Sequence, residues 1–141
     1  MSYIKLSKIL GFVGGTFTIF LGLYEMIWNI FFPGPPDPGW INKGGREAQF
    51  FVSFLVSLFF WSLGFLSLTG SFLLKKRPII GSVLMLIGGI IFTPSWFYLF
   101  SNIGKMSNVF SYFYGLLCSL PFIAGLIVLI NRIHLKLARK H

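Results

Sequence analysis

Four long apolar runs, separated by short polar connections, make up most of the chain. They cover residues 9–32, 48–74, 78–104 and 106–131, and the last three contain no charged residue. A helix needs roughly 20 apolar residues to span the hydrocarbon core of a bilayer, so each run is long enough to cross a membrane. The pattern predicts a single membrane domain over residues 1–141 with four transmembrane helices.

The connections indicate how the four helices follow one another. The first, residues 33–47, is predicted to be an outer loop and holds four prolines within six residues, which cannot continue a helix. The second and third, "KKRP" and "SNIGKMSN", are short enough to make consecutive helices antiparallel neighbours. Pro94 and Pro121 fall inside the third and fourth runs and predict kinks. We therefore expect an up-down-up-down bundle.

Composition and charge agree with this interpretation. A soluble domain of 141 residues with 55% hydrophobic and 11% charged residues could not hide its apolar surface. The net charge of +9 is distributed unevenly. Nine of the twelve basic residues fall at the chain ends and in the second connection: Lys5, Lys8, Lys75, Lys76, Arg77, Arg132, Lys136, Arg139 and Lys140.

The other three basic residues, Lys43, Arg46 and Lys105, belong to the opposite side. A 9:3 bias over short loops predicts that both termini are cytoplasmic, and we expect the plasma membrane of a prokaryote. The basic tail, residues 132–141, either contacts anionic lipid or serves only as a topology determinant. Nucleic acid is not an expected partner.

Small residues recur at helical spacing inside the runs. In the first run they include Gly11, Gly15, Thr18 and Gly22, and the same face carries Glu25. Steps of three and four keep one face toward a neighbour in a left-handed bundle, where small residues let backbones approach closely and hydroxyls can bond across helices. The predicted helix-packing residues are Gly11, Gly15, Gly22, Ser57, Gly64, Gly89, Ser111 and Gly115.

Glu25 is the only charged residue inside an apolar run. An intramembrane carboxylate suggests either a functional site or a structural pair with Lys43, Arg46 or Lys105. Aromatic residues are expected at a similar depth, as an interfacial belt or as the walls of an outer pocket that would suit a cation or a proton-coupled substrate. The residues of this predicted outer pocket are Glu25, Trp28, Trp96, Tyr112 and Tyr114.

Catalytic and metal-binding motifs are missing from the sequence. It has one cysteine, Cys118, and two histidines, His134 and His141, in no recognisable ligand spacing. We therefore expect no cofactor and no enzymatic activity. The leading hypothesis is a small accessory or structural subunit that packs against other membrane proteins, or against itself, in the lipid. The alternative is a small transporter or channel component with Glu25 as its ionisable group.

Overall fold

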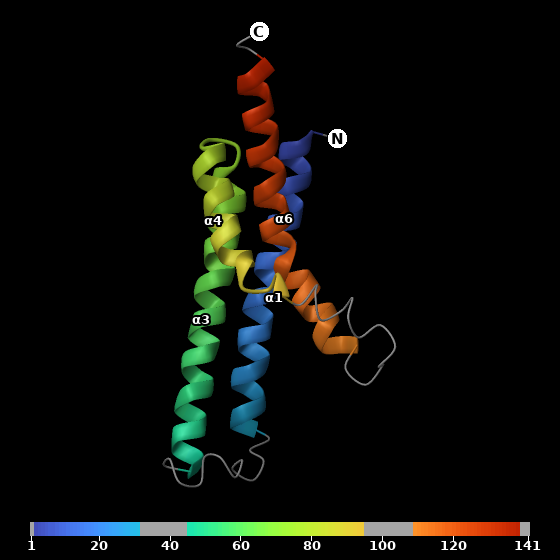
Figure 1. Cartoon of the computed structure of the whole chain (residues 1–141). Helices are drawn as coiled ribbons and strands as arrows, with labels where there is room; N and C mark the ends of the chain where they lie inside the picture. The colour runs from blue at the N-terminus through green and yellow to red at the C-terminus, as the bar shows by residue number, and fades with distance from the viewer. Residues whose placement is uncertain (1, 32–44, 95–108, 139–141) are drawn as a thin grey trace.

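The computed structural model describes residues 2–31, 45–94 and 109–138, and within these ranges the chain is helical apart from short turns at 74–77 and 91–93 (Figure 1). The helices are α1 (Tyr3–Phe31), α3 (Gly45–Leu73), α4 (Pro78–Ile90) and α6 (Val109–Ala138). The prediction of an all-helical chain is confirmed for these residues.

Three of the helices are long and apolar enough to cross a membrane. They contain the segments Tyr3–Trp28, Gly45–Leu73 and Phe113–Ala138, which correspond to the first, second and fourth predicted runs. Helix α1 starts six residues before the apolar run at residue 9, and α6 continues to Ala138, past the end of the run at residue 131. Lys5, Lys8, Arg132 and Lys136 therefore belong to the helices, although they lie outside the predicted apolar runs.

The third predicted span requires a correction. The prediction of one helix over 78–104, kinked at Pro94, is wrong, because α4 has only 13 residues and ends at Ile90. At 1.5 Å per residue α4 is about 20 Å long, less than the ~30 Å hydrocarbon core. The part of this prediction that covers residues 95–104 lies outside the described residues.

Pro94 supplies the physical reason for the early end of α4. It has no N–H to donate to the Ile90 carbonyl four residues earlier, and it disfavours helical geometry at Thr93. The carbonyl oxygen of Ile90 instead accepts hydrogen bonds from the Thr93 backbone N–H, at 3.1 Å, and from Thr93 Oγ1, at 2.7 Å. The tightened turn leaves no unsatisfied carbonyl at this position.

Replacing Pro94 with alanine is expected to extend α4 through the turn. The new N–H can donate to the Ile90 carbonyl, so amide hydrogen exchange at residues 91–93 should slow by roughly tenfold or more in detergent micelles. Pro78→Ala is the matched control, because Pro78 occupies the first turn of α4, where a missing N–H costs nothing. Unchanged exchange in Pro94→Ala would mean that the surrounding helices, and not the proline, impose the break.

The four helices pack around a square. Helix α1 lies against α3 and α6, α4 lies against the same two helices, and α1 and α4 are diagonally opposite. Figure 1 shows that the start of α1, the α3–α4 turn and the end of α6 lie at one end of the molecule. The handedness of the bundle stays a prediction.

Helix α6 changes direction along its length. Its second half runs beside α1, whereas its first half diverges from α1 (Figure 1). Pro121 lies inside this helix and removes one backbone hydrogen bond, which accounts for the bend. The predicted kink at Pro121 therefore opens the bundle between α1 and the first half of α6.

Two clusters of buried apolar side chains fill the interior near α4. One consists of Leu74, Met85, Ala124 and Val128, close to the α3–α4 turn. The other consists of Leu63, Phe92 and Cys118, at the level where α4 ends. Both clusters join α4 to its neighbours, so the short helix is held on two sides.

Candidate functional site

Helices α1 and α3 meet through glycines that leave no room for a side chain. A Cβ atom added to Gly64 would lie 2.8 Å from the Gly15 carbonyl oxygen, and one added to Gly15 would lie 3.0 Å from the Gly64 carbonyl oxygen. Further along, a Cβ on Gly22 would lie 2.6 Å from Trp61 Cδ1. The two backbones are therefore in direct contact, as close packing in lipid requires.

Helix α4 is held in the same way by both of its neighbours. A Cβ on Gly70 or on Gly81 would lie 2.6 Å from the carbonyl oxygen of the other glycine, at the α3–α4 crossing. A Cβ on Gly89 would lie 2.5 Å from the Phe122 backbone nitrogen on α6. A larger residue at any of these positions would force the helices apart.

Seven of the eight predicted helix-packing residues have a described burial, and all seven are buried. These residues are Gly11, Gly15, Gly22, Ser57, Gly64, Gly89 and Gly115. The side-chain placement of Ser111 lies outside the described part of the chain. The sequence reasoning did not identify Gly14, whose Cβ would meet Pro121 and the Leu117 carbonyl, nor the close contacts of Gly70, Gly81 and Gly88. The adjacent glycines Gly14 and Gly15 could have indicated two packing faces on α1, because adjacent residues on a helix face different neighbours.

Most of the buried hydroxyl groups bond within their own helix. Thr18 Oγ1 donates to the Gly14 carbonyl at 2.9 Å, and Ser57 Oγ donates to the Ser53 carbonyl at 2.9 Å. Ser67 donates to the Leu63 carbonyl in the same way, at 3.0 Å. The expectation that hydroxyls would bond across helices is thus wrong for Ser57 and Ser67, because the carbonyl oxygen one turn back accepts the hydrogen bond. The Thr18 side chain also contacts the Cys118 thiol on α6.

A groove of about 870 Å³ lies along α1, on the side where α6 diverges. Its walls come mainly from α1, with Phe92 after the end of α4 and two residues of α6. The lining residues are Phe12, Val13, Thr16, Phe17, Phe20, Leu21, Tyr24, Glu25, Phe92, Tyr114 and Gly115. Its volume is within the range of ligand-binding clefts.

The groove contains part of the predicted outer pocket. Glu25 and Tyr114 both line it, and Glu25 is partly buried. Trp28 does not line it, is half exposed and stacks on Tyr24 with ring centroids 5.9 Å apart. The placement of Trp96 and of the Tyr112 side chain lies outside the described residues.

Several groove residues, most of them apolar, were not part of the predicted outer pocket. Thr16, Phe20 and Tyr24 are four residues apart, as are Val13, Phe17 and Leu21, so they form two adjacent rows on α1. This spacing was present in the sequence. Only the bend at Pro121 shows that Phe20 and Tyr24 face an opening, whereas Phe17 and Leu21 pack against the cluster of Leu63, Phe92 and Cys118.

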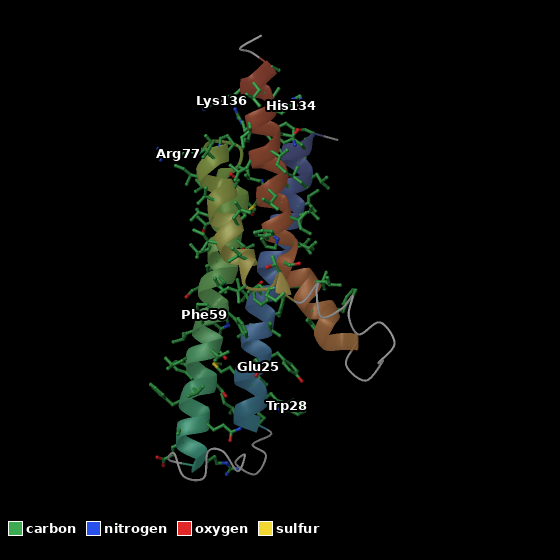
Figure 2. The ribbon with its side chains drawn as sticks, viewed as in Figure 1. Glu25, Trp28, Phe59, Arg77, His134 and Lys136 are labelled. Atoms are coloured by element: carbon green, nitrogen blue, oxygen red, sulfur yellow. The ribbon has the colours of Figure 1, made fainter. Side chains whose placement is uncertain are left out.

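Basic residues gather at the opposite end of the molecule from Glu25. Figure 2 shows Arg77, His134 and Lys136 at the end that holds the α3–α4 turn, whereas Glu25 and Trp28 lie toward the other end of α1. The exposed basic residues of the turn and of the last turns of α6 are Lys75, Lys76, Arg77, Arg132 and Lys136. Arg139 and Lys140 lie outside the described residues. Among the described residues, positive charge is therefore concentrated at the end that holds the α3–α4 turn.

One basic residue of α1 also contributes to packing. The Lys8 Nζ atom lies 5.5 Å from the centroid of the Phe72 ring on α3, and the Phe12 ring meets Phe72 edge-on at 6.2 Å. Such a cation–π contact at an exposed site is worth about 0.5–1 kcal/mol. Lys8 therefore stays at the end of the bundle and covers its α1–α3 seam.

Within the described ranges, no group of three or more His, Cys, Asp or Glu side chains is placed to hold a metal ion. The Cys118 thiol is buried and in hydrogen-bonding contact with the Thr18 side chain. Comparison with protein-family models, with curated proteins and with solved structures finds no match to this chain.

Proposed function

We propose that the chain is a four-span integral membrane protein of a prokaryotic plasma membrane, folded as a left-handed up-down-up-down bundle. Both termini and the α3–α4 turn face the cytoplasm. The three long apolar helices and the concentration of basic residues at one end of the molecule support this orientation. The basic end also fits contact with anionic lipid headgroups.

The role that the geometry supports best is that of a non-catalytic accessory subunit, which packs against another membrane protein or a second copy. The observation that carries it is a stripe on α3 of four exposed apolar residues spaced by seven. These residues, here called the α3 stripe, are Phe51, Leu58, Phe65 and Phe72, with 60%, 38%, 59% and 59% of their surface exposed.

A spacing of seven residues suits a partner helix. It keeps one narrow row of side chains on the same side of α3 over its whole length, as in helices that cross at a small angle. Each aromatic ring offers about 150–250 Å² of contact area, and the dispersion contacts of such a row with another helix stabilise the pair of helices. Inside the bundle the helices meet through close glycine contacts. This tight packing favours an assembly role over a catalytic one.

Purification in a mild detergent followed by native mass spectrometry tests the accessory role. We expect a species heavier than the 16.0 kDa chain, either an oligomer or a complex with another membrane protein. Alanine at Phe51, Leu58 and Phe65 together should reduce that species about a hundredfold or more, because each truncated side chain loses more than about 1 kcal/mol of packing and every 1.4 kcal/mol is tenfold.

Alanine at Ile79, Val83 and Ile87, which are exposed on α4, is the matched control and should leave the assembly intact. A monodisperse monomer with no co-purifying protein would contradict the accessory role. An assembly that forms to the same extent after the three alanine substitutions in the α3 stripe would also contradict it.

A second candidate function is transport, with Glu25 as the ionisable group. The observation that favours it is the groove, which places this carboxylate beside aromatic rings at the end of an apolar cleft. Carboxylates within membrane spans mark ion and substrate pathways in many transporters. Flux of a cation into proteoliposomes that is lost in Glu25→Gln, while the variant still folds, would support this function. Equal flux in both proteins would exclude it.

A further inference from the structure

We propose that the groove on α1 binds one acyl chain of a membrane phospholipid whose headgroup ends in a primary amine, with the ammonium group at Glu25. This inference goes beyond the accessory role and requires neither transport nor a protein partner. It rests on the length of the groove, on the chemistry of its lining and on the position of its one carboxylate.

The groove is long enough to cross one leaflet of a membrane. Phe12 and Glu25 both line it and are 13 residues apart on α1, which corresponds to about 20 Å along the helix. Half of the ~30 Å hydrocarbon core is about 15 Å. A chain that lies along α1 from Phe12 can therefore extend from mid-membrane to the headgroup region, where Glu25 lies.

The lining suits a hydrocarbon chain. Most of the groove residues are apolar, and the hydroxyls of Thr16, Tyr24 and Tyr114 are its few polar groups besides Glu25. Phe12, Phe20 and Tyr24 are 46%, 61% and 57% exposed, so the walls are open on the flank of the bundle. A flank opening at this depth faces the acyl chains of the bilayer, which favours a lipid over a solute from the aqueous phase.

The carboxylate selects the headgroup. Among the described residues that line the groove, Glu25 is the only acidic one and none is basic. An ammonium group at this position would meet the carboxylate and the ring of Tyr24, which together favour a cation through charge and through cation–π attraction. A headgroup with net negative charge and no amine would be repelled by the same carboxylate.

Native mass spectrometry of the intact chain in a non-ionic detergent tests the proposal, with two lysophospholipids of the same chain length as probes. Lysophosphatidylethanolamine carries the primary amine and lysophosphatidylglycerol does not. We expect one retained equivalent of the first probe and about tenfold weaker retention of the second, the effect of one charge-assisted hydrogen bond. Equal retention of both probes by the unaltered protein would overturn the proposal.

Two variants separate the headgroup from the chain. Glu25→Gln should bring the first probe down to the level of the second, and Glu47→Gln, which changes an exposed acid on α3, is its control. Thr16→Phe should weaken both probes by filling the groove, and Ser62→Phe on exposed α3 surface is its control. Retention that is unchanged in Glu25→Gln would overturn the assignment of the ammonium to this carboxylate.

The outcome is distinguishable from that of the assembly experiment. A monomer that retains the amine-bearing probe would contradict the accessory role and support the lipid groove. An assembly that retains neither probe would support the accessory role and contradict the lipid groove. Retention without any cation flux would leave the lipid proposal standing and exclude transport.

Discussion

Replacement of Gly64 by leucine is expected to destabilise the bundle by about 3 kcal/mol or more. Its Cβ alone would lie 2.8 Å from the Gly15 carbonyl oxygen and 3.1 Å from the Ile19 backbone nitrogen. These are backbone atoms of α1, which cannot rotate away as a side chain can. The helices must separate, and the contacts along the whole α1–α3 seam weaken with them.

Unfolding by titration with SDS, followed by far-UV circular dichroism, measures this effect. Ser62→Leu is the matched control, because it makes a similar small-to-leucine change two residues away on an exposed part of α3. It should shift the midpoint little. A Gly64→Leu protein as stable as Ser62→Leu would show that α1 and α3 do not pack through this crossing.

The second large effect concerns orientation in the membrane. Glutamine at five basic residues should reduce the charge bias from 9:3 to 4:3 and give a mixture of two orientations. The five residues are Lys75, Lys76, Arg77, Arg132 and Lys136. None of them is buried, so the folded bundle should tolerate the change.

Labelling of single cysteines with a membrane-impermeant maleimide in intact cells measures the orientation. In a Cys118→Ser background, Ser2→Cys marks one end of the bundle and Glu47→Cys marks the other. With native charges, only the cysteine at position 47 should react, whereas with the five glutamines both positions should react in part. Labelling at position 2 with native charges would contradict the proposed orientation.

The sequence was sufficient to predict which segments form helices, because apolar length alone decides this in a membrane. It could not define where they end. Lys5 and Lys136 are polar, yet their backbones stay helical beyond the apolar segments, so hydropathy marked the ends too early. For α4 the error went the other way, because Ile91 and Phe92 are apolar although Pro94 had already ended the helix.

The candidate site was predictable only in part. The spacing of Gly15 and Glu25 indicated one face of α1, and the structure places Gly15 at α3 and Glu25 in the groove. The groove itself depends on where α6 diverges from α1. The sequence indicates that α6 bends at Pro121 but does not indicate the direction of the bend. That direction decides whether Phe20 meets a helix or an opening.

The central claim is that protein, and not lipid alone, covers the α3 stripe in the membrane. The most direct measurement introduces the photo-crosslinking residue p-benzoylphenylalanine at Phe65 and irradiates intact cells, with the same residue at exposed Ile87 on α4 as the control. We expect a protein adduct from position 65 and none from position 87. Adducts to lipid alone at position 65, or equal protein adducts at both positions, would contradict the claim.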